Sequence, residues 1–204
     1  MNYTGPKVRK SRKIGVPMTA KAGKIMSSDR AGRKSPPGQH GSTKRRGKLS
    51  VYGTQLFEKQ KLRLQYNIHE RQMTNYFKKA SHLTGNTGDI LLQMLETRLD
   101  ALVFRSGLAR SMSAARQYVN HGHFLVNGKP VNIPSYQVKV NDVVSVREKS
   151  RKMEAFQESI RTAAPPVYLT LSKADFSVKF LHLPAREEVP VVCEIPLVIE
   201  FYSR

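Results

Sequence analysis

The chain has 204 residues and carries 35 lysine and arginine side chains against 15 aspartate and glutamate side chains, a formal net charge of +20. A charge this large on so short a chain indicates a polyanionic partner. No apolar run approaches the ~18 residues of a membrane span, and the first residues lack the apolar stretch of a secretory signal. Cys193 is the single cysteine, which excludes an internal disulfide and a multi-cysteine zinc site. We therefore expect a soluble polyanion-binding protein of a reducing compartment, with no membrane partner.

The first quarter of the chain is the most basic part. Residues 1–50 hold 14 basic side chains and one acid, Asp29, and only 5 of them are Leu, Ile, Val or Phe. Such a segment buries too little apolar surface to offset its chain entropy. We expect residues 1–50 to be an extended, Gly/Pro-rich arm that becomes ordered against RNA phosphates; a solvated tail is the alternative.

Residues 51–88 are predicted to be the helical part of a first domain. Apolar residues between positions 56 and 66 are interspersed with charged ones in a pattern typical of an amphipathic helix. A second helix is predicted from about His69 to His82, because apolar residues recur there at three- and four-residue spacing. The sequence GNTG at 85–88 then ends the helical pattern.

Residues 89–150 have the pattern of a small α/β module. Asp89 is predicted to cap a single helix that runs past Val103 and stops at Gly107. Ser111 or Ser113 can cap the next helix, which ends at the glycine at position 122. On this second helix, the residues expected to face inward are Ala115, Tyr118 and Val119, and those expected to face outward are Arg116, Gln117 and Asn120.

A hairpin is predicted directly after these helices. Asn127-Gly128 lies between two β-favouring segments, and an Asn-Gly pair suits the positive φ angles of a two-residue turn. A further strand is predicted over Val143–Val146. The module should therefore consist of two helices packed on a short antiparallel sheet. We expect one outer surface of the module to be shared by Arg98, Arg110, Arg116 and Lys129, either as an RNA-binding surface or as a solvated face.

The last segment, 151–204, has seven basic and seven acidic side chains, which favours packing and protein neighbours over RNA. A helix is predicted over 151–163, and strands are predicted over Tyr168–Leu171 and Ser177–Leu183. Two prolines nearby suggest that Leu197–Phe201 is an edge strand or irregular. The predicted fold class is α+β: a mainly helical N-terminal domain with a basic arm, onto which residues 151–204 pack back, plus the α/β module.

Several motifs resemble the ribosomal protein S-four family of the small subunit. RLD at 98–100, SMSAARQYVNHGHFLVNGKPV at 111–131 and PSYQVKVND at 134–142 are similar to the family's RNA-binding module. Outside the module, YTGPK near the start, SPPGQHG at 35–41, YGTQLFEKQKLRLQYNIHERQ at 52–72 and the terminal IEFYSR are also similar to the full ribosomal protein. The similarity covers nearly the whole chain, in the family's order, and is of the bacterial or organellar type.

This resemblance implies a primary binder of 16S ribosomal RNA (rRNA), at a junction of several helices in its 5′ domain, that helps nucleate assembly of the subunit body. It also implies neighbouring small-subunit proteins, especially the fifth, and a place where messenger RNA (mRNA) enters the subunit, with an influence on translational accuracy. The location implied is the cytoplasmic ribosome, with an organellar ribosome as the alternative. Repression of its own translation is a further hypothesis.

The sequence departs from the family pattern at two places. Some members bind zinc through four N-terminal cysteines, whereas this chain has Val8, Ser11 and Ser28 where ligands would be sought, so we expect no metal and no other cofactor. Met112 lies where the family often has arginine, which removes one expected phosphate contact. His121 and His123 have no cysteine nearby, and we expect them to end a helix and contact RNA.

Two alternative classes of function are an RNA-modifying enzyme and a DNA-binding regulator. An RNA-modifying enzyme would need a separate catalytic domain, but only 57 residues follow position 147 and no catalytic motif is present, so we expect no enzyme and no small-molecule substrate. A DNA-binding regulator would also use a pair of helices and a high positive charge. Against it, the second helix runs directly into the Asn-Gly hairpin.

The residues predicted to contact RNA are basic or hydrogen-bonding side chains in three regions. In the arm they are Arg33, Lys34, Gln39, His40, Lys44, Arg45, Arg46 and Lys48; on the helices of the first domain they are Arg63 and Arg71; on the module they are Arg98, Arg110, Ser113, Arg116, Asn120, His121 and Lys129. Basic side chains supply a sequence-independent attraction to phosphate that weakens with salt. Structured RNA is read mainly by shape, 2′-hydroxyls and phosphates.

Overall fold

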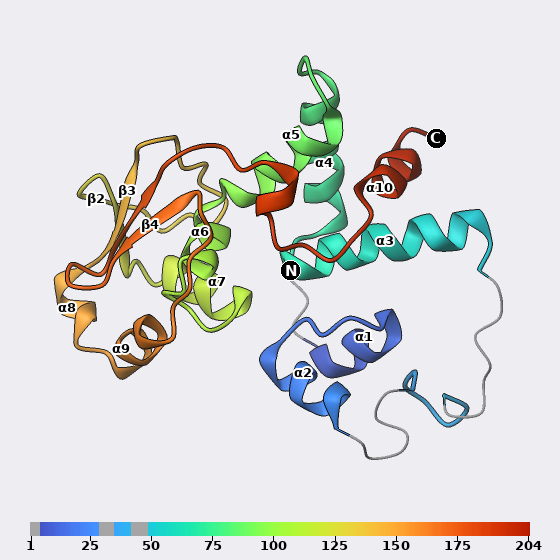
Figure 1. Ribbon diagram of the computed structural model, residues 1–204, viewed down its shortest axis with the longest axis horizontal. Helices are drawn as coiled ribbons and strands as arrows, with labels where there is room; N and C mark the ends of the chain where they lie inside the picture. The colour runs from blue at the N-terminus through green and yellow to red at the C-terminus, as the bar shows by residue number, and fades with distance from the viewer. Residues whose placement is uncertain (1–4, 29–34, 42–48) are drawn as a thin grey trace. The chain divides into compact units, whose positions relative to one another are not determined.

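The computed structural model describes residues 5–28, 35–41 and 49–204. The chain divides into two compact units, drawn in Figure 1. Unit 1 is Met1–Lys79 together with Val191–Arg204, and unit 2 is Ala80–Pro190. Unit 1 is helical and unit 2 combines helices with an antiparallel sheet, which confirms the predicted α+β class.

Unit 1 begins with two short helices, α1 (Lys7–Ile14) and α2 (Ala20–Ser27). Gly15 ends α1 with a φ of 82°, a left-handed conformation that suits glycine, and the Thr19 side chain caps α2 by accepting a hydrogen bond from Ala22 N. The prediction of an extended arm over residues 1–50 is therefore wrong for 7–27. The helix stop at Gly15 and the helix cap at Thr19, four positions later, favour two helices here in spite of the low apolar content of the segment.

Helices α3 (Val51–Gln65) and α4 (Glu70–Ser81) confirm the two helices predicted for this part of the chain. Ser50 caps α3 by accepting a hydrogen bond from Gly53 N at 3.1 Å. On α4 the apolar residues Met73 and Ala80 are fully buried. On α3 the buried residues are Leu62 together with three polar ones, Gln55, Glu58 and Lys59. Tyr66 and Ile68, in the connection between the two helices, are buried as well.

The C-terminal helix α10 (Ile195–Tyr202) lies beside α3 within unit 1 (Figure 1). Gln55 Nε2 on α3 donates to Glu200 Oε2 at 2.7 Å, and Tyr202 Oη donates to Glu70 Oε1 at 2.7 Å. The prediction of an edge or irregular segment at Leu197–Phe201 is wrong. The proline next to Ile195 lies in the first helical turn, where its missing N–H has no partner to lose.

Unit 2 starts with two helices, α5 (Thr87–Glu96) and α6 (Leu99–Arg105), where a single helix was predicted. The chain becomes extended at Arg98, with ψ at 139°, and there it pairs with Gln137 in an isolated antiparallel bridge. The predicted cap is also wrong, because Asn86 caps α5 and Asp89 lies in its first turn. The break has a tertiary cause, because the first backbone N–H groups of α6 donate to carbonyls of a segment about 40 residues downstream. Leu99 N, for example, donates to Tyr136 O at 2.8 Å.

The rest of the module follows the prediction closely. Helix α7 (Met112–Asn120) is capped by Ser111, whose side chain accepts from Ala114 N at 3.2 Å. Strands β1 (Phe124–Val126), β2 (Lys129–Pro130) and β3 (Val143–Val146) are antiparallel neighbours. The turn between β1 and β2 has φ values of 48° at Asn127 and 77° at Gly128, as its Asn-Gly sequence predicted.

The segment after residue 147 completes the same sheet. It forms α8 (Glu148–Arg151), α9 (Glu154–Arg161), β4 (Leu169–Ser172), β5 (Ser177–Phe180) and the short 3₁₀ helix η1 (Arg186–Glu188). The sheet has five strands in the order β2-β1-β3-β5-β4, all antiparallel. Residues 151–190 therefore belong to unit 2, and the prediction that this whole segment packs on the first domain is wrong for them.

The core of unit 2 lies between the sheet and helices α6, α7 and α9 (Figure 1). Phe124 and Phe156 meet edge to face with ring centroids 5.8 Å apart, and both are fully buried. Tyr168 is also buried, and its hydroxyl donates to Glu96 at 3.1 Å, while Arg105 donates to the same carboxylate. Burial, followed by the charge of Glu96, raises the pKa of Tyr168 above its ordinary value. In the described part of the chain, none of the helices has the length and apolar character needed to cross a membrane.

Candidate nucleic-acid interface

In unit 1, the loop 35–41 presents two of the predicted RNA-contacting side chains. Gly41 N donates to Gly38 O at 3.1 Å, so Gln39 and His40 occupy the two central positions of a tight turn, and both are exposed. Amide and imidazole tips in this position can hydrogen-bond to phosphates and 2′-hydroxyls. The other predicted residues of the arm lie outside the described residues: Arg33, Lys34, Lys44, Arg45, Arg46 and Lys48.

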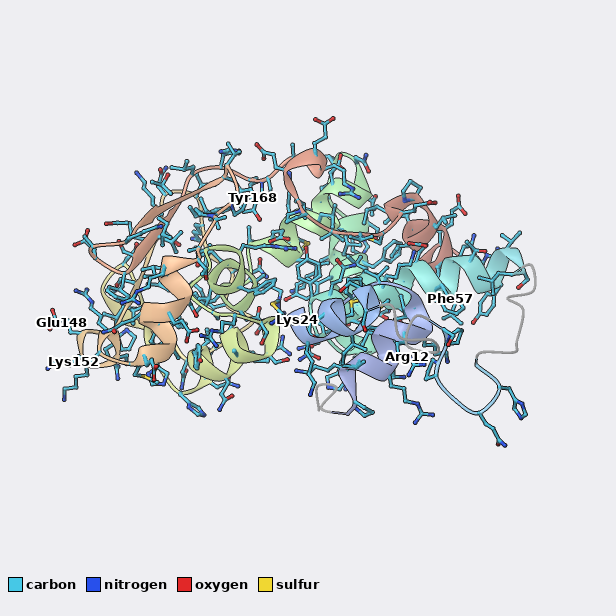
Figure 2. All side chains as sticks on the ribbon, turned by 60° about the horizontal axis from the view of Figure 1, so that its bottom comes forward. Arg12, Lys24, Phe57, Glu148, Lys152 and Tyr168 are labelled. Carbon is cyan, nitrogen blue, oxygen red and sulfur yellow. The ribbon has the colours of Figure 1, made fainter. Side chains whose placement is uncertain are left out.

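Helices α1 and α2 carry exposed basic side chains that the sequence reasoning did not single out. These are Arg9 and Lys13 on α1 and Lys21 and Lys24 on α2, the last of which is labelled in Figure 2. Helix formation gives these charges fixed positions on a folded surface, whereas an extended arm would spread them along a mobile chain. The available signal was Gly15 shortly after the basic pair 12–13, a helix stop with cations in the last turn.

The two predicted residues on α3 and α4 differ in their surroundings. Arg71 is exposed on α4. Arg63 is partly buried, with its Nη1 atom 3.6 Å from Glu70 Oε2, and Glu70 also accepts a hydrogen bond from Lys59 at 2.8 Å. Arg63 therefore helps to join α3 to α4, whereas Arg71 is available to a phosphate.

In unit 2, the structure contradicts the prediction for Arg98 and Arg116. Arg98 is 1% exposed and Arg116 8% exposed, and both donate to the carboxylate of Asp100, which is 0% exposed. Arg98 Nη2 lies 2.9 Å from Asp100 Oδ2, and Arg116 Nη2 lies 2.6 Å from the same atom. These arginines form a buried charge cluster beneath the surface. They cannot share an outer face with Arg110 and Lys129.

The physical reason is that a buried carboxylate needs several donors. Asp100 Oδ1 also accepts from Ala101 N at 3.0 Å, so both oxygens of the carboxylate are satisfied. Helical spacing alone placed Arg116 on the outer side of α7, but the acid on α6 draws its guanidinium inward. A buried aspartate therefore determines the role of a side chain 16 positions away.

The remaining predicted residues of unit 2 lie at least partly at the surface: Arg110, Ser113, Asn120, His121 and Lys129. Arg110 forms an ion pair with Glu158, and both side chains are 58% exposed. An ion pair this exposed is worth about 0–1 kcal/mol, so a phosphate can compete with Glu158 for the guanidinium. Lys129 lies in the exposed strand β2, beside the Asn-Gly turn.

Two histidines lie at the end of α7. His121 and His123 have ring centroids 5.9 Å apart, and His123 Nδ1 lies 2.8 Å from Ser150 Oγ. Burial first, and then the nearby charges of His121 and Arg147, lower the pKa of His123 below its ordinary value. His121, exposed beyond the helix end, is the histidine of this pair that can reach RNA.

Zinc does not fit the residues at the N-terminus. Val8 offers no ligand atom, and the Ser11 hydroxyl already donates to Lys7 O at 3.0 Å and accepts from Met18 N at 3.1 Å. Serine hydroxyls are not the thiolate or imidazole ligands that zinc prefers. Across residues 5–28, 35–41 and 49–204, no group of three or more His, Cys, Asp or Glu side chains is arranged to hold a metal ion.

Two family models match successive parts of the chain. Residues 2–96 match the ribosomal protein S4/S9 N-terminal domain, and residues 97–144 match the S4 domain. The second match begins at the break between α5 and α6 and ends in β3. It therefore covers α6, α7, the hairpin and the start of β3 in unit 2.

Many curated proteins are similar to the chain over its whole length. The small ribosomal subunit protein uS4 of Brevibacillus brevis is 47% identical over 204 residues, covering 99% of this chain and 98% of its own. The protein of the same name from Sulfurihydrogenibium is 46% identical, covering 98% of both chains. That of Thermobifida fusca is 45% identical and covers 100% of both.

Proposed function

The chain belongs to the family of the small ribosomal subunit protein uS4, and from that premise we propose that it binds 16S rRNA directly through unit 1 and the surface of unit 2. The family is one of structural ribosomal proteins without enzymatic activity, and its S4 domain is an RNA-binding domain. The proposed site on the rRNA is a multi-helix junction of the 5′ domain.

The finer parts of the proposal concern the assembled subunit. Early binding to the 5′ domain would help to nucleate assembly of the subunit body. The neutral segment 151–204 would face protein neighbours, including the fifth small-subunit protein, near the place where mRNA enters and where translational accuracy is influenced. The proposed location is the cytoplasmic ribosome. Binding of a similar RNA fold in its own messenger would make the protein a repressor of its own translation.

The distribution of exposed charge in unit 1 is the observation that supports RNA binding most strongly. Lys13, Lys21 and Lys24 are exposed on two helices that pack on one another. The loop 35–41, which exposes Gln39 and His40, is hydrogen-bonded to α1 through the carbonyls of residues 35 and 36. Cations held at fixed positions can match the spacing of phosphates on a folded RNA. A mobile polycation would supply attraction without that selectivity.

The test is binding of the full chain to the 5′ domain of 16S rRNA at about 50 and 300 mM salt, with excess transfer RNA or duplex DNA as competitor. We expect binding that survives the higher salt and both competitors. The variant Lys13→Gln/Lys21→Gln/Lys24→Gln should make the negative slope of log affinity against log salt shallower by about 2–3, because each lost phosphate contact removes about 0.7–0.9 from its magnitude.

A matched control removes the same charge from unit 2. Lys152→Gln/Lys173→Gln/Lys179→Gln changes three exposed lysines in the neutral last segment, and its slope should stay near that of the unmodified protein. Equal slope changes in the two variants would contradict a specific surface on unit 1. If duplex DNA as competitor displaced all of the rRNA from the protein at low salt, the result would favour the DNA-binding alternative.

A further inference from the structure

Helix α1 is held as a fixed platform by a buried hydroxyl. Ser11 is 0% exposed; its Oγ donates to Lys7 O within the helix and accepts from Met18 N in the connection to α2. Ala22 on α2 is also 0% exposed. These buried groups fix α1 relative to α2, so a side chain projecting from α1 has a defined starting point.

Arg12, the residue after Ser11, connects this platform to the loop 35–41. Its Nε donates to Ser35 O at 3.0 Å and its Nη2 donates to Pro36 O at 3.5 Å. Figure 2 labels Arg12 on the helix beside this loop. One guanidinium edge therefore holds two successive carbonyls, a geometry that the single ammonium of lysine cannot reproduce.

The loop transmits this anchoring to its tip. Pro36 and Pro37 have restricted φ angles, so fixing the carbonyls at 35 and 36 also limits the direction of the following residues. The turn then folds back closely: a Cβ added at Gly41 would lie 1.8 Å from Pro36 O, the carbonyl to which Arg12 donates. Arg12 and Gly41 thus converge on one oxygen atom.

We propose that Arg12 is a positioning residue: by anchoring loop 35–41 to α1, it sets the place of Gln39 and His40 for contact with the RNA backbone. The proposal rests on the RNA binding proposed above and adds a residue that acts through the loop. Gln39 and His40 are the central residues of the turn closed by Gly41 N and Gly38 O, and both side chains are exposed. An arginine of the platform thereby fixes two polar tips 27 and 28 positions further along the chain.

The first test exchanges the guanidinium for an ammonium without changing charge. Arg12→Lys in the full chain should weaken binding to the 16S 5′ domain about fivefold to tenfold, with an unchanged salt slope because the charge is retained. The control Arg161→Lys changes an exposed arginine of unit 2 that lies outside the candidate interface, and it should alter affinity less than about twofold. Equal affinities of the two variants would overturn the proposal.

A double-mutant cycle separates positioning from direct phosphate contact. If Arg12 acts through the loop, Arg12→Lys should have almost no further effect in a Gln39→Ala/His40→Ala protein. The same non-additivity is expected with Gly41→Ala, which displaces the turn from Pro36 O. An undiminished effect of Arg12→Lys in both backgrounds would make Arg12 a direct RNA contact and overturn the positioning role.

A measurement on the protein without RNA distinguishes this proposal from the proposed function. Amide hydrogen exchange at Gly41 should be faster in Arg12→Lys than in Arg161→Lys, while exchange at Gly15, whose N–H is bonded to Ser11 O at 2.8 Å, should be equal in both. Unchanged exchange at Gly41 would overturn the inference whatever the RNA binding. If the unmodified chain does not prefer rRNA over duplex DNA, the proposed function is wrong, and so is the role of Arg12 in RNA contact. Faster exchange at Gly41 would then support only the anchoring of loop 35–41 to α1.

Discussion

The two units use their basic side chains in different ways. In unit 2, Arg98 and Arg116 lie almost fully buried and donate to Asp100, so their charges stabilise the fold. In unit 1, the basic residues of α1 and α2 lie largely at the surface, and one of them, Arg12, joins the helix to a loop. The net charge of a segment therefore says little about which cations are available to RNA. What decides is whether a buried acid lies within reach.

This difference has energetic consequences for each unit. A buried arginine whose acid is removed keeps its desolvation cost without compensation. An exposed lysine that is removed leaves the fold almost unchanged but takes a phosphate contact with it. The buried charge cluster of unit 2 should therefore respond to charge substitutions through stability, and the exposed cations of α1 and α2 through RNA affinity.

The largest effect is expected from Asp100→Asn. The substitution removes the charge that Arg98 and Arg116 share and places an amide donor among guanidinium donors, so the free energy of unfolding of unit 2 should fall by about 3–5 kcal/mol. Urea denaturation followed by hydrogen exchange, with peptides of α6 and α7 read separately from those of α3, measures this change. Peptides of α3 should keep their protection.

Glu187→Gln serves as the control for this prediction, because Glu187 is an exposed acid of the same unit. Its effect on stability should remain within about 0.5 kcal/mol. If Asp100→Asn lowered the free energy of unfolding by less than about 1 kcal/mol, the two arginines would not depend on this carboxylate. The difference proposed between the basic side chains of the two units would then be wrong.

A smaller effect tests how closely Gly107 and Ala163 pack against each other in unit 2. Gly107 has a φ of +79°, and a Cβ there would lie 2.5 Å from the Cβ of Ala163; Gly128 has a φ of +77° with nothing within 4 Å. Both Gly→Ala variants incur about 1–2 kcal/mol of backbone strain. Only Gly107→Ala adds overpacking, about 1–3 kcal/mol more. Chemical denaturation of the two variants measures the difference in their free energies of unfolding. Equal values would show that the backbone around Ala163 moves aside at little energetic cost.

Local patterns in the sequence predicted much of this fold. The apolar spacing of α3 and α4, the Asn-Gly turn and the strand Val143–Val146 all depend on residues close together in the chain, and all are confirmed. Two corrections have a common cause. The break before α6 depends on pairing of Arg98 with Gln137, and the inward position of Arg116 depends on Asp100. Interactions between distant residues decide both, and periodicity carries no information about them.

The candidate interface was predictable to a lesser degree. Gln39 and His40 were predicted as RNA contacts within the motif SPPGQHG, and the structure places both on an exposed turn whose Pro and Gly residues are local turn signals. The bonds from Arg12 to this loop span 23 and 24 positions, and no spacing rule connects an arginine of one helix with two carbonyls of a later loop. Residue type predicted that cations would matter, but only the tertiary structure separates structural cations from exposed ones.

The smallest expected effect concerns pH and an acid of unit 1. Although partial burial raises the pKa of Glu70, hydrogen bonds from Lys59 and Tyr202 and the charges of Lys59 and Arg63 outweigh it, so the pKa in the folded protein lies below 4.5. A lowered folded-state pKa stabilises the fold above the unfolded value, and this contribution is lost as pH falls through the folded value. For a partly exposed group the effect is about 0.5 kcal/mol. Urea denaturation from pH 6 to pH 3 should show a weaker loss of unit 1 stability in Glu70→Gln than in the unmodified chain. The exposed Glu194→Gln should follow the unmodified chain, and identical pH profiles of all three would show that Glu70 is held no more firmly than an ordinary surface acid.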